Sequence, residues 1–214
     1  MRSSDYQEGY WERGEGSNYH NYGDDPGWNV VLDVMEAIGV GDPGCDATIV
    51  IVEVGASKGW FGYHARRRGY DWRGFDISEY AVANHAPGVS PYLTVHNAGL
   101  DWPYESESAD IVCAWEFFEH VYDDEILFVL SEMLRVLKPG GELWLKTGIA
   151  IPSDHPFAGQ PDHDQTHVAV HDREWWESLF EMAGLEHLPQ TEAALDRAFS
   201  DRDWQGRFFV WRRP

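Results

Sequence analysis

The chain has 214 residues, of which 43% are hydrophobic, enough for one domain with a substantial core. Its formal net charge is −21, with 37 acidic against 16 basic residues, and such a surface repels phosphate backbones. Nucleic acid is therefore excluded as the expected partner. No run of about 18 apolar residues occurs, and the first residues lack the apolar region of a signal peptide, so we expect no membrane partner.

Cysteine content and charge suggest where the protein works. Cys45 and Cys113 are expected to be reduced thiols in a cytoplasmic protein. The acidity has two explanations. One is a surface adapted to high salt, where screening removes self-repulsion; the other is an ordinarily acidic enzyme from a low-salt host.

The chain begins with an aromatic segment. Residues 5–27 carry four tyrosines and one tryptophan among Gly, Asn, Asp and Glu, which is too aromatic for a disordered region. It is either a strap packed on the core or a lid over a ligand, and in the second case we expect Tyr10 and Tyr19 to face that ligand. Residues 28–39 place apolar side chains at helical spacing, which predicts a helix.

Strands and helices then alternate. The β-branched run 49–54 predicts a buried strand, followed by a glycine turn and a helix over 60–68. Further strands are expected to end at Asp76 and to cover residues 92–97, 109–115 and 142–147, with helices over 79–86 and 123–137 and a turn at 138–141. This order predicts the α/β class, as a three-layer, doubly wound and mostly parallel sheet.

Polar side chains follow several of these strands. Ligands of doubly wound sheets bind at the carboxyl ends of the strands. The residues expected there are Glu53, Asp76, Asn97, Trp115, Glu116 and Thr147.

The remaining chain holds a long irregular segment, residues 148–170, and a helix over 173–183. Ser78 and Asp172 are the expected N-caps of helices 79–86 and 173–183. Residues 154–172 contain four histidines and four aspartates, and an irregular segment of this length is usually functional.

Three interpretations of the histidines stay open. A neutral histidine can act as general base, with His163 and His167 as first candidates and His120 next. A divalent metal is the second possibility, although no spacing is a metal signature and we expect none. The third is that the histidines only stabilise turns.

Four motifs between residues 49 and 147 resemble those of the class I S-adenosylmethionine-dependent methyltransferases, in the same order and at similar spacing. They are Glu53-Val54-Gly55-Ala56-Ser57-Lys58-Gly59, then Gly74-Phe75-Asp76, then Asn97-Ala98 with Trp102-Pro103, and finally Phe118-Glu119-His120-Val121 with Leu137-Lys138-Pro139-Gly140-Gly141. The resemblance implies a seven-stranded sheet whose last strand is antiparallel. It also implies S-adenosylmethionine as cofactor and S-adenosylhomocysteine as product.

The resemblance assigns roles to individual residues. Glu53 would accept hydrogen bonds from the ammonium of the methionine part, Asp76 would bind the ribose diol, and Asn97 the adenine amine. Ser57 stands where the family usually has its middle glycine. The cofactor-binding residues implied are Glu53, Gly55, Ala56, Ser57, Gly59, Asp76, Ile77, Asn97, Ala98 and Trp115, with Tyr10 and Tyr19 from the aromatic segment.

The expected protein is a single methyltransferase domain over residues 1–214. Residues 1–44 would be the aromatic strap and a helix, 45–147 the cofactor-binding core, and 148–214 the substrate-side loop with the C-terminal helix and strands. The expected reaction is methylation of a small polar acceptor, on an oxygen of a sugar or another metabolite.

Three alternatives stay open. Gly55-Ala56-Ser57-Lys58-Gly59 also fits the nucleophile elbow of an α/β-hydrolase, which would make Ser57 a nucleophile. An acid about 20 residues past a glycine turn also fits a nicotinamide dehydrogenase. Finally, a non-enzymatic cofactor-binding protein can have the same fold.

Overall fold

In the computed structural model, which describes residues 2–40, 48–150, 164–200 and 206–214, seven strands form one sheet in the order β3-β2-β1-β4-β5-β7-β6. The strands are β1 (Val50–Val54), β2 (Asp71–Asp76), β3 (Leu93–Val95), β4 (Ala109–Trp115), β5 (Leu137–Lys146), β6 (Glu186–His187) and β7 (Phe208–Arg212). The first five strands pair in parallel, whereas β7 pairs antiparallel with β5 and with β6. The predicted doubly wound, mostly parallel sheet is confirmed, including its antiparallel last strand.

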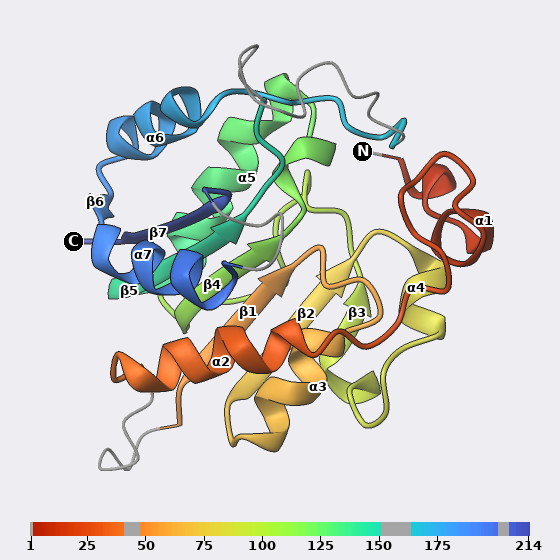
Figure 1. The fold of residues 1–214 in the computed structure, drawn as a ribbon, viewed down its shortest axis with the longest axis horizontal. Coiled ribbons are helices and arrows are strands. Elements are labelled where there is room, and N and C mark those ends of the chain that lie inside the picture. Colours follow the sequence, from red (N-terminus) through yellow and green to blue (C-terminus); the bar gives the residue numbers. More distant parts are fainter. Residues whose placement is uncertain (1, 41–47, 151–163, 201–205) are drawn as a thin grey trace.

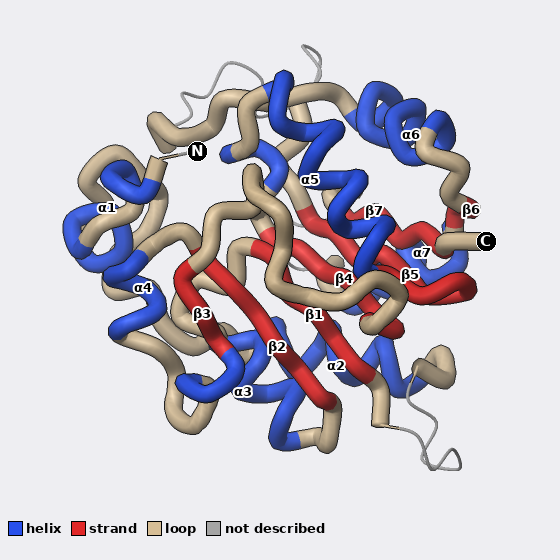
Figure 2. Tube along the Cα trace, turned by 180° about the vertical axis from the view of Figure 1, so that it is seen from behind, coloured by secondary structure: helices blue, strands red, loops and turns tan. Residues whose placement is uncertain are grey.

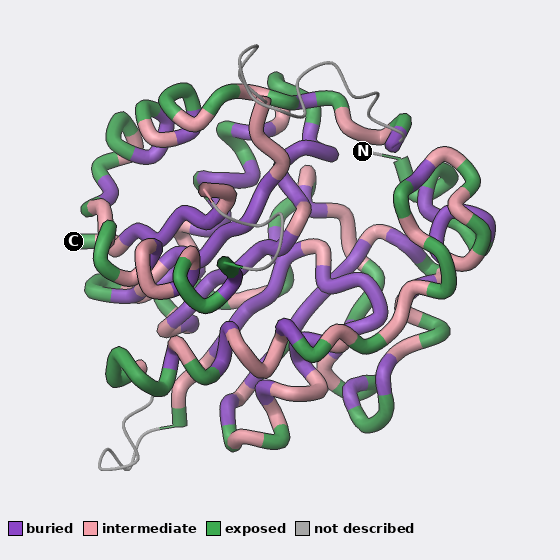
Figure 3. The backbone as a smooth tube through the Cα atoms, in the orientation of Figure 1, coloured by how far each residue is buried: buried purple, intermediate pink, exposed green. Residues whose placement is uncertain are grey.

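Helices cover both faces of this sheet (Figures 1 and 2). They are α1 (Glu8–Glu12), α2 (Gly27–Ala37), α3 (Trp60–Arg67), α4 (Glu79–Ala83), α5 (Asp123–Val136), α6 (Arg173–Met182) and α7 (Pro189–Ala198). Apolar side chains of α2, α3 and α7 form one core cluster with the sheet, and those of α5 and α6 form the other. Figure 3 shows the buried strands between these helices, whose outer sides are exposed.

Strand β1 is central to both core clusters because its side chains alternate between the two faces. Val52 and Val54 pack against the α5 side, and Ile51 packs against the α3 side. Each of these three side chains is at most 1% exposed, as expected for a strand covered on both faces. This burial fixes β1, and with it the position of the turn that follows at the carboxyl edge.

Two predicted caps are present. The Ser78 hydroxyl accepts a hydrogen bond from the Ala81 N–H at the start of α4, and the Asp172 carboxylate accepts one from the Trp175 N–H at the start of α6. The caps satisfy N–H groups that have no partner within the helix. Helix α7, strand β6 and the short α1 were not predicted.

At residues 138–141 the structure has part of a strand where a turn was predicted. There the chain passes from α5 directly into β5 at Leu137. Leu137 pairs with Ala109 and Glu142 pairs with Ile111, so residues 138–141 form an irregularity within the strand. Gly140 supplies the left-handed backbone (φ 77°), and the register shifts between Ala109 and Ile111 of the partner strand. The glycines therefore bend a strand instead of ending it.

The aromatic segment, residues 5–27, lies beyond the carboxyl ends of β1 and β2, where α1 stands beside α4 (Figure 1). Tyr6, Tyr10 and Trp11 are buried and pack with Ala81 of α4. Within the described part of the chain, no helix has the length and apolarity needed to cross a membrane.

Candidate functional site

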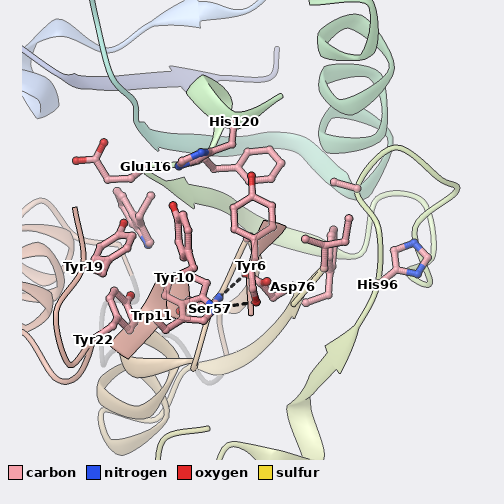
Figure 4. Close-up of a pocket in the computed structure, with 16 residues that line it drawn as sticks. Tyr6, Tyr10, Trp11, Tyr19, Tyr22, Ser57, Asp76, His96, Glu116 and His120 are labelled. Carbon is pink, nitrogen blue, oxygen red and sulfur yellow. Dashed lines mark hydrogen bonds between the residues drawn. The ribbon is translucent and has the colours of Figure 1, made fainter. Parts of the chain in front are cut away.

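A cavity of about 570 Å³, including its open mouth, lies between the carboxyl edge of the sheet and the aromatic segment (Figure 4). The sheet side contributes Gly55, Ser57, Phe75, Asp76, Ile77, His96, Ala98, Trp115, Glu116, Phe117 and His120. The aromatic segment contributes Tyr6, Tyr10, Trp11, Tyr19 and Tyr22. The structure thus brings together residues that are more than a hundred positions apart in the sequence.

The turn after β1 has an unusual backbone. Gly55, Ser57 and Gly59 all have left-handed φ angles, of 67°, 51° and 75°. A Cβ on Gly55 would lie 2.5 Å from the Phe117 ring, so this glycine is required both by its backbone and by its neighbour. Ser57 adopts the conformation that a glycine normally provides, at a cost of about 1–2 kcal/mol. The sequence showed the substitution but not that the glycine-like geometry is retained.

Asp76 lies at the end of β2, and the turn after β1 holds its carboxylate. One carboxylate oxygen accepts the Ser57 N–H at 2.7 Å, and the other accepts the Ser78 N–H at 2.8 Å. Burial raises the pKa of Asp76 to about 6, although the two backbone hydrogen bonds oppose that rise. Each oxygen keeps acceptor capacity toward the cavity, which suits a ligand with two neighbouring hydroxyl groups.

Glu53 is placed differently from the expected ligand contact. Its carboxylate is 3% exposed, accepts the Trp72 indole N–H at 2.8 Å and does not line the cavity. Burial raises the pKa of Glu53 well above its usual range; the Trp72 hydrogen bond opposes this rise, and nearby Asp76 adds to it. The carboxylate therefore supports the sheet beneath the turn, and its contact with a ligand stays a prediction.

The segment after β3 places Ala98 in the cavity but turns Asn97 away from it. The Oδ1 of the Asn97 side chain accepts the Gly99 N–H at 2.9 Å, and Asn97 lines a more open hollow with Ile77, His96 and Leu100. That hydrogen bond is typical of an Asx turn. The adenine contact of Asn97 stays a prediction.

Trp115 and Glu116 form the wall at the end of β4. The Trp115 ring packs against Phe61 and Trp28, and Glu116 forms an ion pair with buried Lys146 of β5. Both also line a second hollow, which opens beside the first and includes Asp164 and His167. Glu116, which also has a left-handed φ of 48°, was expected at this edge but not as the partner of a lysine.

Hydrogen bonds attach the aromatic segment to both sides of the cavity. The Tyr10 hydroxyl donates to Asp164 at 2.8 Å, and the Lys58 ammonium donates to Glu12 and to the Tyr22 carbonyl. Tyr19 stacks on Trp11, with ring centroids 5.4 Å apart. Tyr10 and Tyr19 therefore line the cavity, while Trp11 and Tyr22 were not among the expected contacts.

The candidate bases are divided by the structure. His120 lines the cavity, and its ring centroid is 4.8 Å from that of His167, which lines the neighbouring hollow. His163 lies outside the described residues. Burial lowers the pKa of His120, which favours the neutral ring that a general base requires. In the described part of the chain, Glu119, His120 and His167 offer ligand atoms within 4.8 Å of one another, so they could hold a metal ion.

Comparison with known proteins gives a family model and many related structures. The model, described as "Methyltransferase domain", matches residues 52–145. No curated protein matches the chain. Phosphoethanolamine N-methyltransferase 2 of Haemonchus contortus, solved with S-adenosyl-L-methionine, is 18% identical with a TM-score of 0.63. The match covers 92% of this chain but only 55% of that one.

Two further structures have similar scores. Geranyl diphosphate C-methyltransferase of Streptomyces coelicolor A3(2) is 18% identical, with a TM-score of 0.59, and the match covers 86% of this chain and 75% of that one. The [4+2]-cyclase SpnF is 19% identical, with a TM-score of 0.60, over 95% of this chain and 86% of that one. At such identities the likeness concerns the fold. Residues 52–145 therefore match a methyltransferase domain, and the chain as a whole shares the fold of these class I S-adenosylmethionine-dependent methyltransferase structures.

Proposed function

We propose that the protein transfers the methyl group of S-adenosylmethionine to a small polar acceptor in this cavity, and that the methylated atom is an oxygen. The observation that carries the proposal is Asp76, a buried carboxylate whose two oxygens are fixed by backbone N–H groups at the edge of the cavity. The two hydroxyl groups of a ribose would donate to a carboxylate that does not have to rearrange on binding.

The other contacts fit the same cofactor. The left-handed turn at Gly55 lets the ligand approach the backbone, and Ala98 leaves room beside Asp76 for the adenine. The tyrosines and Trp11 of the aromatic segment supply ring faces, which attract a sulfonium as they attract other cations. Methyl transfer needs mainly alignment and exclusion of water, because the sulfonium is already an activated donor.

The charges around the cavity favour an acceptor without phosphate groups. The related structures named above include one bound to geranyl-S-thiolodiphosphate and Mg²⁺. In this chain Lys146 is paired with Glu116, and Asp164 adds a buried negative charge to the second hollow. A hydroxyl-bearing metabolite such as a sugar meets less repulsion there than a phosphate would.

Transfer to an oxygen requires removal of the hydroxyl proton, and we propose His120 as the base that takes it. His120 lines the cavity, whereas His167 lines only the second hollow beside it. The proposed role of His163 rests on the sequence alone. No resident metal is needed for this chemistry, since the base acts directly on the acceptor.

A hydrolase that uses Ser57 is the second candidate, since this residue lines the cavity on a strained turn. Against it, none of the described histidines hydrogen-bonds the Ser57 hydroxyl, so the usual base for a serine nucleophile is missing from the described residues. The cyclase SpnF also illustrates that this fold can serve other reactions.

Calorimetric titration with S-adenosylmethionine and S-adenosylhomocysteine tests the proposal. We expect both to bind the native protein, and the Asp76→Ala variant to bind them at least tenfold more weakly. The absence of binding to the native protein would refute the function, and unchanged binding by the variant would refute the ribose contact. Binding without turnover on a panel of sugars, phenols and other hydroxyl compounds would instead favour a non-enzymatic role, and ester hydrolysis that Ser57→Ala abolishes would favour the hydrolase.

The setting of the reaction is also a proposal. We infer a cytoplasmic enzyme, supported by the buried free thiol of Cys113, and a surface adapted to high salt, supported by the net charge of −21. Equal unfolding free energies at low and at molar salt would refute the second inference.

A further inference from the structure

Thr166 lies between the His120 ring and the Asp164 carboxylate. Its Oγ1 is 2.8 Å from the Nδ1 of His120 and 2.6 Å from one oxygen of Asp164. The same Asp164 oxygen accepts the Thr166 backbone N–H at 2.9 Å, and the other accepts the Tyr10 hydroxyl at 2.8 Å. Donors on both carboxylate oxygens fix the orientation of Asp164.

The protons available in this series of hydrogen bonds determine the tautomer of His120. The Thr166 hydroxyl has one proton, and an ionised carboxylate has none to share. Two oxygens 2.6 Å apart need a proton between them, so the hydroxyl proton points to Asp164. The Thr166 oxygen must then accept from His120, which places the ring proton on Nδ1 and leaves a lone pair on Nε2.

We propose that Thr166 and Asp164 are positioning residues that hold neutral His120 in its Nδ1–H tautomer, so that Nε2 is the atom that accepts the acceptor's proton. This inference rests on the proposed function of the cavity. As the acceptor oxygen attacks the methyl carbon, its O–H bond breaks and the proton moves to Nε2 of His120. The bond between carbon and sulfur breaks, and sulfur keeps the electron pair as the thioether of S-adenosylhomocysteine.

The groups around His120 determine whether its ring is charged, and in a neutral ring the tautomer decides which nitrogen can accept a proton. The groups that face the ring are Glu119, Asp164, His167 and Tyr6, of which the two acids favour a charged ring and His167 opposes one. Burial lowers the pKa of His120 in spite of these acids, which favours the neutral ring. A neutral imidazole has its lone pair on only one nitrogen, and the hydrogen bond on the other nitrogen decides which one. Once the proton arrives, Asp164 stabilises the imidazolium through the Thr166 hydroxyl.

The decisive measurement is the ¹⁵N NMR spectrum of the histidine side chains in the complex with S-adenosylhomocysteine, with His120→Gln identifying the resonances. We expect the Nδ1–H tautomer of His120 in the native protein and in Thr166→Ser, which keeps the hydroxyl. In Thr166→Val, which has nearly the same shape, we expect the Nε2–H form to appear. A native protein with the Nε2–H form, or Thr166→Val with the native tautomer, would overturn the proposal.

Turnover provides the second readout. On an acceptor found with the panel above, kcat of Thr166→Val should fall on the order of ten- to a hundredfold, by analogy with residues that orient metal-bound histidines. The affinity for S-adenosylhomocysteine should stay within about twofold, and Thr166→Ser should restore kcat. An equal loss of kcat in Thr166→Ser and Thr166→Val would contradict the proposed role of the Thr166 hydroxyl. If the native protein methylates no acceptor, the proposed function fails while the NMR result still decides the tautomer.

Discussion

Asp76→Asn tests how much burial of Asp76, the acid proposed to bind the ribose, costs the unliganded protein. The pKa of Asp76 is raised from 3.8 to about 6, so between these pH values the folded protein holds a proton that the unfolded chain has released. A raised acid pKa contributes stability that is complete below pH 3.8 and is lost as the pH rises through about 6. About two pKa units at about 1.4 kcal/mol each give roughly 3 kcal/mol. Because the side chain is 7% exposed, solvent screening removes little of this.

Urea unfolding of the ligand-free protein between pH 4 and 7 measures this effect. The native protein should lose roughly 2 kcal/mol more over this range than the Asn variant, because part of the roughly 3 kcal/mol lies below pH 4. Glu53, whose pKa is also raised by burial, is present in both proteins, so its contribution largely cancels in the difference. If the two proteins lose stability in parallel, the burial cost assigned to Asp76 is wrong.

Cofactor binding should show the opposite dependence on pH. A ribose diol donates to the ionised carboxylate, so binding S-adenosylhomocysteine favours release of the Asp76 proton. Below about pH 6 the affinity of the native protein should fall by up to tenfold per pH unit. The Asn variant should bind weakly at every pH, and an affinity for the native protein that is independent of pH would argue against the ribose contact.

Three further outcomes are expected. Gly55→Ala should bind S-adenosylhomocysteine at least tenfold more weakly, because the added Cβ would collide with the Phe117 ring. Its unfolding free energy should also fall by more than that of the control variant Gly88→Ala. Gly88 has a similar φ of 77° but no atom within 4 Å of the added Cβ, so this control has only the backbone strain of about 1–2 kcal/mol and should bind normally. Trp72→Phe removes the indole donor to buried Glu53 and should lower the unfolding free energy by about 1–3 kcal/mol; a loss below about 0.5 kcal/mol would contradict this account. Dialysis against a chelator should leave turnover unchanged and metal analysis should find no stoichiometric metal, whereas a loss restored by one divalent ion would point to Glu119 and the two histidines beside it.

The sequence predicted the sheet well because its evidence is local. A β-branched run followed by a small-residue turn, and an acid at the end of the next strand, are features of neighbouring residues. The positions of Gly55 and Asp76 at the edge of the cavity follow from that order. The prediction of a turn at residues 138–141 was wrong because it used the same local evidence. Pairing with β4 at Leu137 and again from Glu142 onward places this glycine-rich stretch inside strand β5.

Orientation of side chains could not be predicted in the same way. Whether Glu53 meets a ligand or Trp72 depends on a residue of another strand, and whether Asn97 points into the cavity depends on the turn it forms with Gly99. Thr166 stood in the histidine-rich segment, yet nothing in the sequence pairs it with His120, which is 46 residues away. Such contacts come from tertiary packing, which spacing does not encode.

The attachment of the aromatic segment has a kinetic consequence. Tyr10 donates a hydrogen bond to Asp164 on one side of the cavity. On the other side, Lys58 donates hydrogen bonds to Glu12 and to the Tyr22 carbonyl. In the proposed reaction the product would lie beneath this segment, and we expect the breaking of these contacts to limit how fast it leaves. We therefore expect that a substitution that removes one of these three contacts changes how long the product stays, although Asp76 and its hydrogen bonds remain in place.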